Sequence, residues 1–272
     1  MGKEKLAGWF MQPLTDKTMI VRRQEAVREL ESFTQLRQHF YVTGILHPGN
    51  QSDQQLITLL GKAAPCLINN KIWKLLIYLI PSIWLLIAIG CALNLLPISI
   101  AGVFFGLSFI VAYINAKQIT MVHNSLDKME QILHTYSNLI KCIEGESFQS
   151  AELADIHQRF ASDGQTASSI IKKLSGHIGA LNQRFSTIGV ILNIFTLRDT
   201  RMAMKLEKWK MEHGDDTERW FEALALFDAY CSLGGFAFNH PEYIYPEIAD
   251  AYFKMEGKAL GHPLLRRDVC VK

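Results

Sequence analysis

Hydrophobic and charged positions divide this 272-residue chain into one apolar block and two polar flanks. The block, Leu75–Ala116, is 42 residues long, contains no Asp, Glu, Lys, Arg or His, and is bounded by Lys74 and Lys117. A helix needs about 20 predominantly apolar residues to cross the hydrocarbon core of a bilayer. The block therefore predicts two apolar helices joined by a turn, enough for a transmembrane hairpin.

The turn is predicted near the middle of the block, at Asn94 and Pro97, because these residue types favour turns and end helices. The two arms, 75–93 and 98–116, are then 19 residues each, or roughly 28 Å at 1.5 Å per residue. The alternative is a hairpin buried in a soluble core. It is disfavoured because a soluble helix normally keeps a polar stripe, and neither arm has one.

Basic and aromatic residues at one end of the hairpin predict its orientation. Lys71, Lys74 and Lys117 flank this end, and Tyr78 and Tyr113 lie close to it. Lys is enriched on the cytoplasmic side of membrane helices, and Tyr is enriched at the membrane interface. We therefore predict that the lipid bilayer is a partner and that the three lysines flank the anchor. The expected location is the inner, cytoplasmic membrane, with both flanking regions in the cytoplasm.

The N-terminal flank, residues 1–70, is predicted to consist of helices broken by turns. After a first helix, Thr15 or Asp16 can cap a second one, because short polar side chains accept hydrogen bonds from first-turn amides. Ser52 and Gln55 have the spacing of a capping box for a further short helix.

Downstream of the block, apolar residues recur at intervals of three and four and predict a helix over 117–145. Two more helices are predicted over 148–161 and 164–182. Residues 186–197 form a second apolar run, broken only by Ser, Thr, Asn and Gly. This run is too short to span a membrane, so we predict a buried core helix there.

The C-terminal flank is predicted to hold two amphipathic helices, 198–213 and 218–237, separated at Asp215-Asp216-Thr217. A strand is predicted over 252–258. Since strong strand patterns are otherwise lacking, the predicted fold class is all-α, a helical bundle with an inserted two-helix hairpin.

Composition and motifs limit the chemistry that this chain can carry. The formal net charge is only +2 and no basic stripe is visible, so the charge pattern does not indicate a nucleic-acid partner. Five scattered cysteines without a CxxC pair fit reduced thiols better than disulfides or a zinc site. GxxxxGK[ST], GxGxxG and HExxH motifs are absent. We expect no complete catalytic site, no cofactor site and no metal site within this chain.

Several distinctive residues have a packing or solvent role as the simplest explanation. Aromatic side chains at helical spacings favour a core over a base-stacking platform, and a Gly-Gly pair in an apolar helix favours close packing. Arginines spread over one helical region favour a solvated face over phosphate contacts. The residues concerned are Trp209, Trp220, Phe221, Phe227, Gly234, Gly235, Arg22, Arg23, Arg28 and Arg37.

Two segments resemble the MutS-type DNA mismatch-repair family. Leu6–Asp16 reads LAGWFMQPLTD and Arg23–Leu30 reads RQEAVREL, which is similar to the opening of the family's core domain. Leu226–Leu233 (LFDAYCSL), Tyr245–Ile248 (YPEI) and Gly261–Leu265 (GHPLL) are similar to the last lever helix and the entry to the ATPase domain. The segments lie at the two ends of the chain in the order that the family has.

The resemblance implies a membrane-linked branch of the family, with a hairpin where other members insert a DNA-clamping subdomain. It implies that ATP and Mg²⁺ bind to a full-length parent, that the parent is a homodimer through its ATPase domain, and that double-stranded DNA is a candidate partner. Ile248 matches the position of an aromatic residue that stacks on adenine in the family. The implied domains are a helical core (1–70 and 198–251), the hairpin (71–117), lever-like helices (118–197) and the start of a truncated ATPase domain (252–272).

The leading hypothesis is a membrane-anchored core and lever fragment, itself not an enzyme, that couples a downstream ATPase domain to DNA or a partner. The alternatives are a non-catalytic DNA-binding module and a membrane scaffold unrelated to repair.

Overall fold

The computed structural model describes residues 2–45, 58, 60–61, 67–114, 119–120, 129–162, 164–183, 186–250, 254–258, 260–262 and 265. These residues are mostly helical, which confirms the predicted helical class, and they include one small two-stranded sheet. The elements are α1 Gly2–Met11, α2 Lys17–Ser32, α3 Thr34–Ile45, α5 Lys71–Ala92, α6 Ile98–Ile114, α8 Met129–Glu144, α9 Ala151–Gln158, β1 Ala161–Ser162, β2 Gln165–Thr166, α10 Ala167–Asn182, α11 Thr187–Thr196 and α12 Arg198–Asn239.

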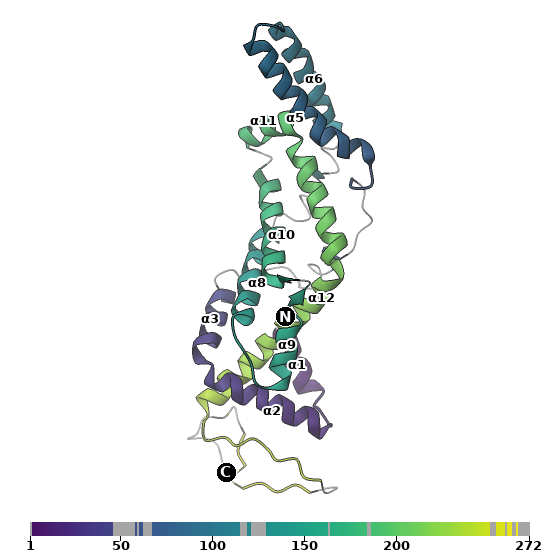
Figure 1. The fold of residues 1–272 in the computed structure, drawn as a ribbon. Coiled ribbons are helices and arrows are strands. Elements are labelled where there is room, and N and C mark those ends of the chain that lie inside the picture. Colours follow the sequence, from purple (N-terminus) through teal and green to yellow (C-terminus); the bar gives the residue numbers. More distant parts are fainter. Residues whose placement is uncertain are drawn as a thin grey trace.

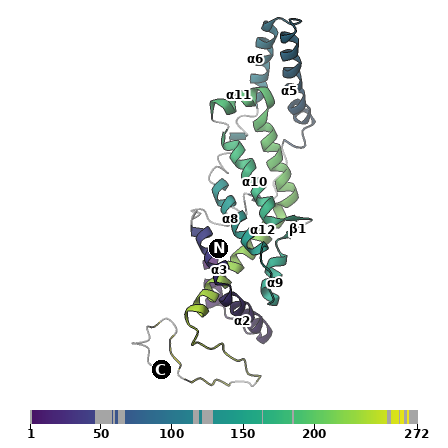
Figure 2. The ribbon, with the colours of Figure 1, turned by 60° about the vertical axis from the view of Figure 1, so that its left-hand side comes forward.

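The molecule is elongated, with α12 running through most of its length (Figure 1). The helices α5 and α6 project from one end, and α11 packs against both of them. The helices α8 and α10 lie along the middle, while α1, α2, α3 and α9 gather toward the other end. A view turned by 60° shows the same order along the long axis (Figure 2).

The helix α12 continues for 42 residues, so the predicted break at Asp216 is wrong. Thr217 Oγ1 donates back to the carbonyl of His213 at 3.0 Å, and Asp216 pairs with Arg219 at 2.9 Å. These local contacts satisfy the polar side chains that would otherwise compete with the helix. At 1.5 Å per residue, α12 is a rod of roughly 63 Å.

Of the two buried clusters among the described residues, the smaller joins the first turns of α12 to α5, and the larger surrounds the middle and the C-terminal half of α12. Ring contacts join other helices to it: Phe40 of α3 lies 5.2 Å from Phe227, and Tyr136 of α8 lies 5.3 Å from Phe221. The predicted packing role of the aromatic residues is confirmed, because all four are buried: Trp209, Trp220, Phe221 and Phe227.

The N-terminal helices pack on the far end of α12, although about 200 residues separate them in sequence. The rings of Trp9 and Tyr230 lie 4.8 Å apart, and the Arg23 guanidinium lies 3.9 Å above the Trp9 ring. Gln24 Nε2 donates to the carbonyl of Pro246 at 2.9 Å. The N-terminal helices, the end of α12 and the segment that follows it at Pro246 are therefore parts of one packed unit.

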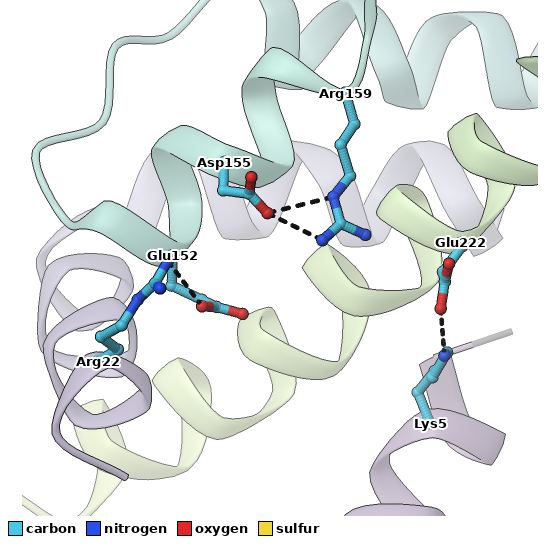
Figure 3. Close-up of polar contacts among 6 residues, drawn as sticks. All are labelled: Lys5, Arg22, Glu152, Asp155, Arg159 and Glu222. Carbon is cyan, nitrogen blue, oxygen red and sulfur yellow. Dashed lines mark hydrogen bonds and ion pairs between the residues drawn. The ribbon is translucent and has the colours of Figure 1, made fainter. Parts of the chain in front are cut away.

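Ion pairs join several helices at the end of the molecule where α1, α2 and α9 lie. Because these side chains are partly exposed, each pair contributes little to stability. A hydrogen bond from Lys5 lowers the pKa of the Glu222 carboxyl, against the opposing effect of burial. Figure 3 shows Lys5–Glu222 at 2.8 Å, Arg22–Glu152 at 3.5 Å and Arg159–Asp155 at 2.8 Å.

Carboxylates fix the starts of helices in this region. Asp16 caps α2 by accepting a hydrogen bond from the Met19 amide at 2.8 Å, one of the two caps predicted for this helix. The Glu29 carboxylate reaches across to accept from the amides of Gln149 and Ser150 at 2.6 and 2.8 Å. Negative charge at a helix N-terminus is stabilised by the helix dipole, so Glu29 fastens the start of α9 to α2.

Other predictions on the flanks fare unevenly. The helix predicted over 148–161 is shorter, because the chain turns after α9 into the β1–β2 hairpin, where Gly164 has a φ of +70°. Gly adopts this left-handed conformation without steric cost. The predicted strand over 252–258 is wrong for its described part, 254–258, which forms no strand. Ser52, Gln55 and most of the first half of the helix predicted over 117–145 lie outside the described residues.

Candidate functional site

The helices α5 and α6 project beyond the other helices (Figures 1 and 2), and many of their apolar side chains are exposed. Only 22% of the most apolar 18-residue stretch of α5 is buried. An exposed apolar surface of this extent marks an interaction site, because water would disfavour it. The exposed large side chains include Leu75, Leu79, Leu85, Leu86 and Ile89 of α5 and Val103, Leu107, Ile110 and Ile114 of α6.

Two helices in the described part of the chain are long and apolar enough to cross a membrane by length and composition, α5 and α12. Half of the most apolar stretch of α12 is buried, and the aromatic residues of this helix lie in the core. A helix that packs in this way belongs to the body of the protein. The helix α6 is equally free of charge but has 17 described residues. The apolar surface of α5 and α6 is therefore the candidate site.

Three polar side chains within α5 and α6, those of Ser82, Trp84 and Ser108, are hydrogen-bonded inside the protein. Trp84 Nε1 donates to the hydroxyl of Ser108, which is buried between the helices, at 3.2 Å. Ser82 Oγ donates to the carbonyl of Tyr78 at 2.8 Å. In hydrocarbon no water replaces a missing partner, so internal bonding of this kind is what a lipid environment requires.

A proline inside α5 leaves one helical carbonyl without its usual donor, and a residue of α12 replaces that donor. Pro81 has no amide hydrogen, so the carbonyl of Ile77, four residues earlier, cannot receive its usual helical bond. The Arg201 guanidinium donates to this carbonyl at 2.9 Å. The first turns of α12 are thereby tied to the lower half of α5.

The base of α5 is fastened to α12 by a carboxylate. Both oxygens of Glu207 accept hydrogen bonds from the amides of Leu67 and Ile68, at 2.9 to 3.1 Å. Asn70 then caps α5 by accepting from the Ile72 amide at 3.0 Å. Together with Arg201, these contacts hold α5 to α12 at two levels. Sequence patterns do not reveal them, because the partners are more than 100 residues apart.

The apolar run at 186–197 is not the buried core helix that its length predicts. It forms α11, in which Gly189 and Ile194 are the buried residues, while Ile188 is 71% exposed. Its Phe195 ring packs on Trp84, with 4.4 Å between ring centroids. The prediction failed because shortness excludes a span but does not decide whether an apolar helix is covered.

The predicted membrane-flanking residues lie at the base of α5. Lys71 is its first residue, Lys74 lies one turn further on, and both are exposed. Tyr78 follows on the same helix and is also exposed. Lys117 lies outside the described residues. If α5 enters a bilayer, Lys71 and Lys74 mark its aqueous end.

The predicted adenine-contacting position, Ile248, lies far from the apolar hairpin. It is half-buried and lines a groove of about 620 Å³ between α1–α2 and the segment that follows α12. Trp9, Arg23 and Tyr245 also line this groove. Its walls are largely apolar, and the described residues contain no group of three His, Cys, Asp or Glu that could hold a metal ion.

The four arginines of the N-terminal region are engaged within the protein. Arg22 pairs with Glu152, and Arg37 donates to the carbonyl of Leu30 at 2.7 Å at the end of α2. Arg23 and Arg28 lie over the rings of Trp9 and Tyr245, respectively. These contacts hold α2 in place, and they compete with any contact to phosphate.

Comparison with models of known protein families, with curated protein sequences and with solved structures finds no match. The resemblance to MutS-type proteins therefore depends on the residues quoted above.

Proposed function

We propose that this chain is the membrane-anchored core and lever of a MutS-like protein. In this proposal α5 and α6 hold the protein at a bilayer, with both flanking regions in the cytoplasm. The opposite end connects to a downstream ATPase domain that binds ATP and Mg²⁺ and forms the homodimer. The chain itself transmits changes of shape between that domain and its DNA or protein partner and is not an enzyme.

The observation that carries the proposal is the position of α12. This single rod begins beside the apolar hairpin and ends where the two family-like segments pack, at the contacts of Trp9 with Tyr230 and of Gln24 with Pro246. Rigid helices transmit displacement over long distances as whole bodies. Since Arg201 and Glu207 attach α5 to the same rod, a displacement at one end reaches the other.

Membrane anchoring is tested by fractionation of cells that express the chain. The matched variant replaces residues 72–116 with a short Gly-Ser linker. The intact chain is expected in the membrane pellet after an alkaline carbonate wash, and the variant in the soluble fraction. Recovery of the intact chain in the soluble fraction would refute the anchor, whereas a variant that stays in the pellet would locate the anchor elsewhere.

The MutS-like part is tested separately from the anchor. A coding sequence that continues beyond Lys272 is expected to contain GxxxxGK[ST], the loop that cradles nucleotide phosphates. A continuation without this motif would contradict the coupling role. A gel shift of the hairpin-free variant with double-stranded DNA across a salt series tests the rival DNA-binding module. That rival predicts binding that weakens steeply as salt rises.

A further inference from the structure

The helix α11 lies across the long axis beside the apolar hairpin (Figures 1 and 2). Ser186 caps it by accepting from the Gly189 amide at 3.0 Å, and Leu197, with a φ of 48°, turns the chain sharply into α12. The outward side chains of α11 are apolar: Ile188, Val190, Ile191 and Leu192 are exposed. The exposed apolar surface of the hairpin therefore continues onto a helix that runs across it.

The contact between α11 and the hairpin lies near the middle of the hairpin, well below its tip. Phe195 packs on Trp84 of α5 and lies 6.2 Å from Phe105 of α6. Beyond these contacts α5 continues only through Leu85–Ala92, and α6 begins at Ile98. Eight helical residues rise roughly 12 Å. That height is close to half of the roughly 30 Å hydrocarbon core, the thickness of one leaflet.

Charged residues follow α11 at once. Arg198 and Asp199 open α12, and Arg201 reaches Ile77 in the lower half of α5. If the hairpin crossed the whole bilayer, α11 and the charged residues that follow it, Arg198 and Asp199, would lie within the hydrocarbon, where charged side chains are strongly disfavoured. If the hairpin enters only one leaflet, they lie among the headgroups. The exposed Lys205 and the half-buried Arg198 then lie at the level of anionic lipid phosphates, whereas Arg201 stays bonded to the Ile77 carbonyl.

The tip of the hairpin is built for a dry environment. Leu95 is 73% exposed and Ile98 is 83% exposed, and no charged residue lies near them in sequence. The four successive amides from Leu93 to Leu96 all donate to carbonyls at the end of α5, at 2.9 to 3.2 Å. Gly90 accepts two of these bonds, and its lack of a side chain leaves room for Leu96 to fold back on α5. A turn in hydrocarbon must satisfy its own amides in this way.

We propose that the α5–α6 hairpin enters only one leaflet of the bilayer and that α11 lies in the membrane plane beside it, at headgroup level. The inference rests on the membrane anchoring proposed above and specifies its depth. The partner is a bilayer with anionic lipids, and the protein inserts into it from one side. A hairpin inserted from the cytoplasmic leaflet also returns both flanks to the cytoplasm.

The depth is measured with an environment-sensitive fluorophore on single cysteines. The five native cysteines are replaced by alanine, and Leu95→Cys, Ile98→Cys, Leu107→Cys, Ile188→Cys and Lys208→Cys are introduced one at a time. The labelled proteins are reconstituted into vesicles of phosphatidylcholine with a minority of phosphatidylglycerol. Quenching is compared for nitroxides at deep and shallow acyl positions and for iodide on both sides of the bilayer.

The two tip probes are expected to be quenched most by the deep nitroxide and to be protected from iodide. The α11 probe is expected to respond most to the shallow nitroxide, and the control at Lys208, which is exposed on the body of α12, to iodide alone. Iodide quenching of both tip probes, with lipid quenching along the hairpin at Leu107→Cys, would show a full span and overturn the inference alone. Iodide quenching at every position would overturn the membrane anchor as well.

Discussion

Two adjacent glycines in α12 provide a stringent test of how the N-terminal helices pack on the rod. A Cβ atom on Gly234 would lie 3.0 Å from Leu30 Cβ, 3.2 Å from the Leu30 carbonyl carbon and 3.3 Å from the Glu31 amide nitrogen. Leu30 is fully buried, so α2 itself would have to shift. A Cβ on Gly235 would meet only a guanidinium nitrogen of Arg37 at 3.3 Å, the far end of a flexible side chain.

The two substitutions should therefore differ in sign. Replacing a helical Gly by Ala gains about 0.8–1 kcal/mol of helix propensity. At Gly234 this gain is opposed by overpacking, which costs about 1–3 kcal/mol. We expect Gly234→Ala to lower the free energy of unfolding by roughly 0.5–2 kcal/mol. We expect Gly235→Ala to raise it by roughly 0.5–1 kcal/mol, because Arg37 can move aside.

The assay is thermal unfolding followed by circular dichroism, with all proteins in the same detergent. For a chain of this size, 1 kcal/mol changes Tm by roughly 2–4 °C. Gly234→Ala should lower Tm by a few degrees, and Gly235→Ala, its matched control, should raise it slightly. Equal shifts of the same sign in both variants would refute the close approach of α2 to α12 at Leu30.

Three further predictions concern single contacts. Asp16→Ala removes the cap of α2 and should cost about 0.5–2 kcal/mol in unfolding free energy, measured by chemical denaturation against Asp16→Asn, which can still cap and should lose little. Arg201→Met should lower the free energy of unfolding by about 1–3 kcal/mol, because the Ile77 carbonyl loses its donor. The loss should shrink when Pro81→Ala supplies a helical amide to the same carbonyl. An undiminished loss in the double variant would contradict this pairing. Burial, reinforced by the charge of Lys205, lowers the pKa of His177, so the folded state resists its protonation, and stability should fall as the pH drops below about 6.5, where the unfolded chain takes up the proton. The Tm of His177→Gln should depend less on pH in this range, and an unchanged pH dependence would exclude His177 as a cause.

Local sequence patterns correctly predicted the elements that depend only on neighbouring residues. The uncharged block predicts a pair of apolar helices, and Asn94 and Pro97 predict the turn between them; in the structure α5 ends at Ala92 and α6 begins at Ile98. Asp16 was one of two caps predicted for α2, and it provides the hydrogen bond. Such features follow from the preferences of neighbouring residues, which act before any tertiary contact forms.

Patterns misled where two local tendencies compete. Asp215-Asp216-Thr217 has the composition of a helix start, yet α12 continues through it. Thr217 bonds back to His213, and burial of the aromatic residues on both sides of Asp216 stabilises one unbroken helix. Helix propensity is a weak preference that tertiary packing overrides. The groove beside Ile248 was equally invisible, because its walls come from both ends of the chain.

Composition and periodicity are properties of each segment alone, so they were enough to predict a helical protein with 42 consecutive uncharged residues. Which apolar surfaces remain uncovered depends on how the whole chain packs. This packing left α5, α6 and α11 exposed while it buried the aromatic residues of α12, and it brought Arg201 to the carbonyl that Pro81 leaves without a helical donor. Burial and hydrogen bonding between distant segments depend on where the whole chain places its neighbours, and no local pattern encodes that.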